Sequence, residues 1–507
     1  MEEAEDTAVC CLWEDLHWAD PSTLELLALY LDQVPTARML AMLVFRPEFT
    51  PPWTIRSHMT QFTLSRLGQP HVVAIIERVT GGKALPNEVV QQIAAKTDGV
   101  PLFVEELTKT VLESDIVRAV NGHYELTGPV SALSIPVTLQ DSLMARLDRL
   151  PLAKGVAQLG ATIGREFNYE LLHATELLAE EELQQGLEQL VQAELVYQRG
   201  YLPDAQYTFK HALIQDTAYQ SLLKRTRQQY HRQIAEVMEQ QFAERVSAQP
   251  ELLAHHYTEA QLIEQALPYW LQAGQQATQR FANTEAIQHL DKGVALLQTL
   301  PDSPERAQHE LPFHMALQAS LFTTTGWASP ELGRSMERAY TLSQQVGEPR
   351  QIFDVLMGLC PFHMGGQSEL RTSLEVAEQM LRLAQGQDDA TLMQRAHLMV
   401  ANTLFYMGNL STTQIHLAQG LALGDAVQDG FIKQLGADAR MVLLSYVALT
   451  LWVQGFPEQA LQRSTEAITQ AQELGHPFNS VMGLELLRCS MYYVARRNRP
   501  KSELRRL

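Results

Sequence analysis

The 507-residue sequence has few cysteines, no long apolar run and no excess of positive charge. Its four cysteines are not in metal-ligand spacing, which argues against a disulfide scaffold and favours reduced, buried thiols. No stretch approaches the roughly 18 apolar residues of a membrane span. A formal net charge of -19 argues against binding of nucleic acid or of an anionic membrane. The acidic N-terminus does not resemble a signal or transit peptide, so we expect a cytoplasmic protein.

The composition is that of an ordinary globular protein. Hydrophobic residues make up 46% of the chain and charged residues 19%, which supplies enough apolar side chains for buried cores. This composition argues against a disordered or collagen-like chain. At about 150 residues per domain, the length predicts three or four domains.

Residues 1–50 predict a β–α–β unit of a parallel sheet. The short apolar run 8–13 is typical of a strand buried on both faces. Asp20 and Pro21 then favour a helix start, as the N-cap and the first helical residue. A second apolar run follows at 39–45 and predicts the next strand.

Charged side chains follow both predicted strands. Glu14 and Asp15 come after the first strand, and Arg46 comes after the second. Ligands of open α/β sheets bind beyond the carboxyl ends of the strands. Paired acids there can hold Mg2+ and orient a water, and an arginine can bind a phosphate group. On spacing alone, it is as reasonable that these charges only mark where each strand leaves the core.

Two segments resemble motifs of a known family. Residues 12–22, LWEDLHWADPS, look like the Walker B segment of the STAND class of signalling NTPases. The closest branch is the large bacterial ATPase–TPR proteins, which are often fused to adenylate cyclase or kinase domains. Residues 45–49, FRPEF, look like its sensor 1 segment. The resemblance implies ATP or ADP with Mg2+ as the cofactor, with Glu14 contacting the magnesium site, Asp15 polarising water and Arg46 sensing the γ-phosphate.

The sequence contains no phosphate-binding loop of the form G-x-x-x-x-G-K-[ST], which would precede a Walker B strand. The one Gly-Lys pair, Gly82-Lys83, is followed by Ala84 and lacks the earlier glycine. No segment therefore offers the backbone amides and lysine that hold β- and γ-phosphates. We expect an N-terminally truncated, degenerate ATPase that does not hydrolyse ATP alone. The exposed edge of its partial sheet would favour self-association.

Residues 51–114 predict a helical lid. Gly99 and Pro101 are typical of the end of one helix and the start of the next. The segment around them also looks like the GxP motif of STAND proteins, which implies that Pro101 lies near the adenine of a bound nucleotide. Glu105 and Glu106 are predicted to be solvated helix charges rather than catalytic groups.

After a predicted linker at 115–136, residues 137–224 predict a winged helix. Helical periodicity is followed by two β-rich runs, 195–198 and 207–209, which indicate a hairpin. This region holds 7 Lys/Arg and 12 Asp/Glu, and its net charge of -5 opposes DNA binding and favours a switch module. The family resemblance makes His211 a candidate contact to the nucleotide phosphate. The alternative is a histidine packed at a helix start.

Residues 225–300 predict a helical connector with the first repeats, and 301–507 predict a TPR-like α-solenoid. Turn glycines at 366, 408 and 455 lie 42 and 47 residues apart, each between two apolar helices. This period is longer than the roughly 34 residues of a TPR, so the units are extended. The concave surface of such an array suits a protein partner or a small effector.

Two local clusters look like sites but have simpler explanations. The basic stretch 224–232 is predicted to be a solvated helix face that pairs with Glu236 or Glu239. His255 and His256 are adjacent, and adjacent side chains of a helix point about 100° apart. We therefore expect no metal bound by this histidine pair.

The predicted fold is mainly α, with a partial parallel α/β P-loop NTPase remnant, a winged helix and a TPR-like α-solenoid. Three functions remain open. The first is a signalling scaffold with a sensor or protein-binding array. The second is an active ATP-hydrolysing switch, possibly associated with adenylate cyclase, whose P-loop lies on another segment. The third is a peptide-binding solenoid with a vestigial N-terminal third.

Overall fold

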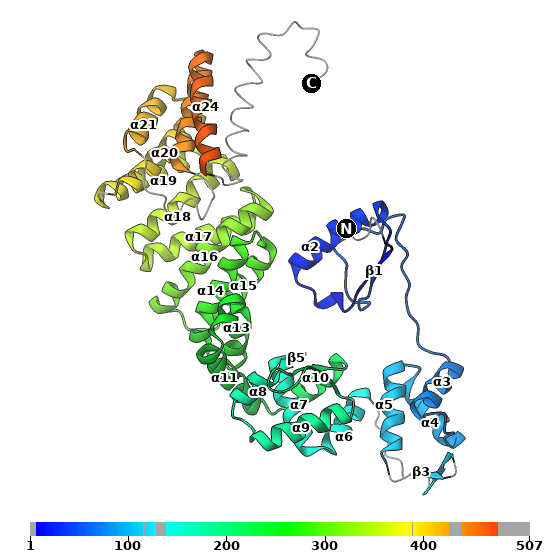
Figure 1. Cartoon of the computed structure of the whole chain (residues 1–507). Coiled ribbons are helices and arrows are strands. Elements are labelled where there is room, and N and C mark those ends of the chain that lie inside the picture. The colour runs from blue at the N-terminus through cyan, green and yellow to red at the C-terminus, as the bar shows by residue number, and fades with distance from the viewer. Residues whose placement is uncertain are drawn as a thin grey trace. The chain divides into compact units, whose positions relative to one another are not determined.

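The computed structural model of the chain is mainly helical (Figure 1). It describes residues 7–114, 117–120, 122–127, 138–387, 389–424 and 438–474. Two compact units can be separated: the first is Met1–Cys11, Leu31–Ala41 and Pro47–Tyr269, and the second is Leu12–Tyr30, Met42–Arg46 and Trp270–Leu507. Among the described residues, no helix has both the length and the apolar character needed to cross a membrane.

The N-terminal segment forms the predicted β–α–β unit. Its elements are β1 (Val9–Trp13), α2 (Pro21–Gln33) and β2 (Met39–Leu43). The N–H of Val9 donates to the carbonyl of Arg38 at 2.9 Å, and the N–H of Val44 donates to that of Trp13 at 2.8 Å. The two neighbouring strands therefore run in the same direction. The carboxylate of Asp20 accepts the backbone N–H three residues later at 2.8 Å, as expected of an N-cap.

The strands of this unit are covered on one face only. Leu27 and Leu31 of α2 are buried, whereas alternate residues of both strands are exposed. Leu12, Leu40 and Val44 have 53%, 58% and 46% of their surface exposed. The prediction of strands buried on both faces is therefore wrong. The physical reason is that an apolar run shows only that a strand can be buried. Burial on both faces also requires an element that packs against each face.

A helical body follows in the first unit. We use this name for α3 (Gln69–Val79), α4 (Asn87–Thr97), α5 (Pro101–Leu112) and the hairpin of β3 (Val117–Val120) and β4 (His123–Leu126). Its core includes Val89, Ile93, Val104 and Leu107, which have no exposed surface. Each helix contributes one apolar face to this core, as its periodicity predicts.

The hairpin lies in segment 115–136, which the sequence predicts to be a linker. Val120 pairs with His123, and Gly122 adopts a φ of 86°, which suits a two-residue hairpin turn. Val117 is buried against the helical body. The described part of this segment is thus a folded hairpin, because its short strands have an apolar surface to pack against. Residues 128–136 of the predicted linker lie outside the described residues.

The next part of the first unit combines helices with a small sheet, and we call it the mixed body. It comprises α6 (Leu139–Asp148), α7 (Pro151–Ile163), β5 (Glu166–Asn168), α8 (Tyr169–Ala174), α9 (Glu180–Gln192), β6 (Val196–Arg199), β7 (Gln206–Phe209) and α10 (Ala212–Gln220). The antiparallel sheet has the order β5-β7-β6, so the predicted hairpin is confirmed. Phe167 and Phe209 pack across it, with ring centroids 5.3 Å apart.

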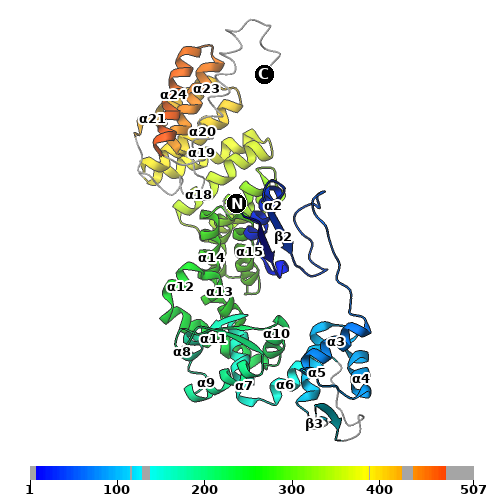
Figure 2. The ribbon, with the colours of Figure 1, turned by 45° about the vertical axis from the view of Figure 1, so that its right-hand side comes forward.

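Helices continue from here to the end of the described chain. They are α11 (Lys224–Gln241), α12 (Ala243–Ala248), α13 (Pro250–Glu259), α14 (Ile263–Gln279), α15 (Asn283–Gln298), α16 (Pro304–Thr325), α17 (Pro330–Val346), α18 (Pro349–Pro361), the π-helix η4 (Phe362–Gly366), α19 (Leu370–Gln387), α20 (Ala390–Tyr406), α21 (Leu410–Ala422), α23 (Ala439–Val453) and α24 (Pro457–Leu474). From α15 onward each helix packs on the next, and Figure 2 shows α18 to α24 stacked as an array.

The three predicted turns all separate packed helices of this array. Gly408 lies between α20 and α21 with a φ of 79°, and Gly455 lies between α23 and α24 with a φ of 89°. Left-handed backbone favours glycine, which explains the residue type at both turns. Gly366 lies between α18 and α19, where an added Cβ would come within 2.4 Å of the carbonyl oxygen of Trp327. Glycine here permits a close approach of two backbones.

Candidate functional site

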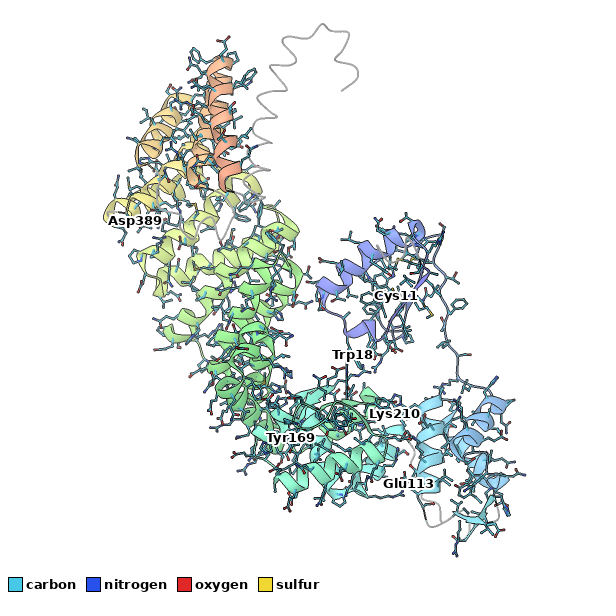
Figure 3. All side chains as sticks on the ribbon, viewed as in Figure 1. Cys11, Trp18, Glu113, Tyr169, Lys210 and Asp389 are labelled. Atoms are coloured by element: carbon cyan, nitrogen blue, oxygen red, sulfur yellow. The ribbon has the colours of Figure 1, made fainter. Side chains whose placement is uncertain are left out.

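The structure places three of the predicted site residues at one edge of the β1–β2 pair. Glu14 is exposed directly after β1, and Asp15 follows with a left-handed backbone at a φ of 57°. Arg46 is exposed after β2, and its guanidinium carbon lies 5.2 Å from the ring centroid of Trp18, which Figure 3 labels. The N–H of Leu16 donates to the carbonyl of residue 44 at 3.1 Å, which holds the two strand ends together.

This edge can contact a metal ion and a phosphate group, but it offers little to hold either. Two carboxylates suit Mg2+, and a guanidinium suits a phosphate oxygen. The stacking of Arg46 on Trp18 orients the guanidinium. The 507-residue sequence has no glycine-rich lysine loop to add. The arrangement therefore supplies contacts to a nucleotide without a phosphate cradle.

Pro101 begins α5 and is exposed, at the end of a tight turn. Gly99 has a φ of 70°, and an added Cβ would lie 2.2 Å from the carbonyl oxygen of Leu67. The N–H of Leu67 also donates to the carbonyl of Gly99 at 2.8 Å. Both the backbone conformation and this close approach therefore require glycine at position 99. The turn fixes where α5 starts.

Glu106, one helical turn further on, is buried with only 1% of its side chain exposed. It forms an ion pair with Arg146 of α6, whose side chain is 3% exposed and which also donates to the carbonyl of Ala193 at 2.8 Å. The prediction that Glu106 is solvated is therefore wrong. The reason is that α6 packs on this side of α5. A signal was available, because Arg146 lies between Leu143 and Leu147 on the apolar face of its helix.

Glu105 is also paired rather than simply solvated. Its Oε1 accepts hydrogen bonds from the ammonium groups of Lys109 and Lys210, both at 3.0 Å. Lys109 donates in addition to Glu194 at 2.6 Å. Burial raises the pKa of Glu105, but the two ammonium groups outweigh it and lower the pKa to about 2. Glu105 is therefore a carboxylate at any ordinary pH.

His211 is the N-cap residue of α10 and follows Lys210, which Figure 3 labels. Its Nε2 atom is buried, with no hydrogen-bond partner among the described residues. Burial, and then the positive charge of Lys210, lower the pKa of His211. The structure thus brings a neutral His211 close to the charges of α5, which begins at Pro101. Glu14, Asp15 and Arg46 belong to the second unit, whereas Pro101 and His211 belong to the first.

A buried histidine pair lies where α11 packs on α13. The Nδ1 atoms of His231 and His256 are 2.8 Å apart, and the Nε2 of His231 lies 2.9 Å from the hydroxyl of Tyr219. Burial, followed by the nearby His255 and Arg227, lowers the pKa of His231 to about 3. One neutral ring therefore donates to the other. Among the described residues, no group of three or more His, Cys, Asp or Glu could hold a metal ion.

The basic stretch 224–232 makes local contacts. Arg232 donates to Glu236 at 2.7 Å across one helical turn, which confirms one predicted pair. Arg227 instead stacks on the ring of Tyr219, with its guanidinium carbon 4.3 Å from the centroid. Glu239, the other predicted partner, accepts hydrogen bonds from two tyrosine hydroxyls at 2.6 and 2.5 Å. Lys224, Arg225 and Arg232 are exposed, as the predicted solvated face requires, and Arg227 is half-buried.

A groove of about 440 Å3 lies on the helical array between α21, α23 and α24. Its floor is apolar and includes Leu417, Leu444 and Leu451. Arg440, Arg463 and Glu466 line it as well, and Arg463 pairs with Glu466 at 2.7 Å. Sequence periodicity could not reveal this groove, because its residues come from three helices whose spacing depends on packing.

Comparison with known proteins gives a relative of low identity and solved structures of low similarity, two of which are described below. No protein-family model matches the chain. An uncharacterized protein of Rhizobium meliloti (strain 1021) is 26% identical over 498 residues, which are 95% of this chain and 46% of the relative. The chain thus spans about half the length of the curated relative it matches.

The first solved structure is a signal transduction ATPase with numerous domains (STAND) protein with a tetratricopeptide repeat sensor from Pyrococcus horikoshii. It is 11% identical with a TM-score of 0.35, covering 97% of this chain and 79% of that one. The second is the apo form of RapI, which is 11% identical with a TM-score of 0.32, covering 83% of this chain and 99% of that one. Both TM-scores are too low to show a shared fold.

The buried ion pair gives a first prediction. Replacing Glu106 by Gln leaves the buried Arg146 with only the partly exposed Glu113 as a counter-charge, so we expect the free energy of unfolding to fall by up to about 3–5 kcal/mol. The double variant Glu106→Leu with Arg146→Leu removes both charges and is expected to recover most of that loss. Glu113→Gln is the control: this carboxylate is also 3.3 Å from Arg146 but 44% exposed. Its replacement should cost less than about 1 kcal/mol in urea unfolding. Equal losses in E106Q and E113Q would contradict the buried pair.

The histidine pair predicts acid sensitivity. The folded-state pKa of His231 is about 3, below the ordinary value of 6.5, so the unfolded chain binds more protons between these values. The contribution of this histidine to the free energy of unfolding is therefore fully present above pH 6.5. It is lost as the pH falls toward 3, by up to about 1.4 kcal/mol per pH unit for each such histidine. Urea unfolding from pH 7.5 to about 4.5 measures this slope. His231→Gln should flatten the slope, whereas His173→Gln, at an exposed position, should not. An unchanged slope in H231Q would show that the pair does not carry the effect.

Proposed function

We propose that the chain is a regulatory signalling protein of the STAND type, in which a TPR-like array binds a protein partner. It carries a nucleotide-site remnant and does not hydrolyse ATP alone. The main support is the array of α15 to α24, in which successive helices stack and leave a lined groove. Stacked helix pairs build extended surfaces that suit peptides and protein segments.

The groove suits an extended segment or a helix of a partner with apolar and acidic side chains. Its apolar floor would take aliphatic side chains, and its two arginines, set against the single carboxylate of Glu466, would favour an acidic group. A small acidic effector with an apolar part is the second kind of ligand with this chemistry. The size of the groove, about 440 Å3, is within the range of small-molecule sites, so both ligands fit.

The mixed body is proposed to be the winged helix of this protein. Helices followed by an antiparallel hairpin, with a third short strand, support that assignment. The net charge of -5 over residues 137–224 favours a role as a packing module rather than a DNA reader. Its close contacts with α5, through Arg146 and Lys210, support a role in switching.

The β1–β2 edge is proposed to be the remnant of the nucleotide site. Glu14, Asp15 and Arg46 would contact magnesium, water and the γ-phosphate in the roles that the family resemblance implies, and Pro101 and His211 would contact the base and a phosphate. The sequence has no phosphate loop, which supports weak binding and no turnover by these 507 residues. Since the chain spans 46% of its relative, activity of a longer protein is a separate question.

The nucleotide proposal predicts no measurable turnover. We expect that the chain with ATP and Mg2+ releases phosphate no faster than its Asp15→Asn variant, because the triphosphate has no amide and lysine cradle. Release of labelled phosphate under excess enzyme measures this rate, and fluorescent ATP titration measures affinity. Micromolar magnesium-dependent affinity, lost in D15N and R46A, would instead support an active switch.

The partner proposal predicts a charge-sensitive groove. Arg463→Glu is expected to weaken partner or effector binding at least tenfold, because it replaces the Arg463–Glu466 pair by two carboxylates that repel acidic side chains. Arg382→Glu, at an exposed position of α19 that does not line the groove, is the matched control and should bind as wild type. Crosslinked partners identified by mass spectrometry and then titrated against each variant give the measurement. Equal binding by R463E and R382E would place the partner elsewhere.

A further inference from the structure

The helical body and the mixed body meet through charged side chains. Each body has an apolar core of its own, and α5 supplies Val104, Leu107 and Val111 to that of the helical body. Between the two bodies, Leu139 of α6 adds an apolar contact to the charged ones. The charged side chains concerned are Glu105, Glu106 and Lys109 on α5, and Arg146, Glu194 and Lys210 on the mixed body. Glu113 lies 3.3 Å from Arg146 and 3.7 Å from Arg149, so four carboxylates and four cations balance at the interface.

The interface has a buried layer and an outer layer. In the buried layer, Arg146 pairs with Glu106, and the hydroxyls of Thr110 and Ser142 are 3.1 Å apart. In the outer layer, Lys109 and Lys210 each lie 3.0 Å from the same Oε1 of residue 105. In the outer layer Glu194 is the member most open to solvent, with 62% of its side chain exposed against 17% for Lys109 and 15% for Lys210.

Glu194 completes the outer layer and has an unusual backbone. Its Oε2 lies 2.6 Å from the ammonium of Lys109 and 3.6 Å from that of Lys210. Its φ is 54°, directly after the C-cap of α9, where a glycine would avoid the steric cost. The carboxylate of Glu194 joins two lysines of different bodies. The side chain is nevertheless 62% exposed, so solvent ions can compete for it.

We propose that Glu105, Lys109, Glu194 and Lys210 form an ionic latch that docks the helical body on the mixed body, and that Glu194 is its releasable member. Exposed ion pairs weaken as salt rises, whereas the apolar core of each body does not. The two bodies therefore separate as folded units when the latch opens, with the buried pair as the last contact to break. Opening frees two ammonium groups beside His211. The latch requires neither nucleotide nor partner, so it stands apart from the proposed function.

Glu176 provides a matched comparison within the same body. It follows α8 with a φ of 51°, close to the value of Glu194, and its side chain is exposed. Glu176 forms no ion pair with a described residue. Glycine should relieve backbone strain at both positions, but only at position 194 would it remove the carboxylate of the latch. The pair of variants therefore separates the electrostatic effect from the backbone effect.

The test measures the distance between the bodies in the full chain. Spin labels are placed on cysteines introduced at the exposed Gln91 of α4 and Glu182 of α9, with the native cysteines other than buried Cys360 replaced by serine. Pulsed dipolar spectroscopy then gives the distribution of distances. We expect one narrow distribution at low salt, and a broader, longer one at about 1 M NaCl, where the Debye length is near 3 Å.

Variants decide between the latch and a simple structural role. E194G and E194Q are expected to broaden the distribution already at low salt, while E176G and the conservative E194D keep it narrow. Melting curves confirm that each variant is folded. E194Q removes the charge without introducing glycine, so it tests the latch even if E194G changes the turn. A distribution in both E194G and E194Q as narrow as wild type would overturn the proposal. So would equal broadening by E194G and E176G.

Discussion

The buried pair of Arg146 and Glu106 is the constraint on which the junction of the two bodies depends. Apolar surfaces can slide past each other at little cost, whereas a buried guanidinium must meet its carboxylate in one geometry. Arg146 also donates to the carbonyl of Ala193, so one side chain fixes α5, α6 and the end of α9 together. We interpret this pair as a specificity element rather than a source of net stability, since charges lose hydration when buried.

Polar contacts recur where packed elements of different parts meet. His231 and His256 join α11 to α13 by a hydrogen bond between two neutral rings, and Tyr219 extends the chain of bonds to α10. In the array, Glu310 of α16 is buried and accepts two hydrogen bonds from Arg338 of α17, at 2.7 and 3.0 Å. Directional bonds of this kind set how helices are aligned, and apolar side chains supply most of the burial energy.

The difference between local apolar patterns and polar contacts among packed elements explains which features the sequence could predict. The β–α–β unit, the β6–β7 hairpin and the turns at Gly408 and Gly455 follow from periodicity and turn chemistry within a few residues. The Arg146–Glu106 and His231–His256 contacts join residues 40 and 25 positions apart, so they depend on how helices cross. The predictions of strands buried on both faces and of a linker at 115–136 were wrong for the same reason. Local patterns show what a segment can bury, and packing decides what covers it.

The negative charge at the end of β1 limits how the candidate nucleotide edge could contact a triphosphate. Glu14 and Asp15 lie near each other at the end of β1, and a triphosphate brought to them without metal would be repelled. Mg2+ would neutralise part of that charge, and Arg46 would add one favourable contact, yet neither replaces the converging amides that fix β- and γ-phosphates. Two acids and one arginine can therefore contact a nucleotide that is bound by other groups, but they cannot bind it tightly by themselves. Under the proposed function, this edge would therefore be a sensor contact, and the binding energy of a nucleotide would come from groups other than these three side chains.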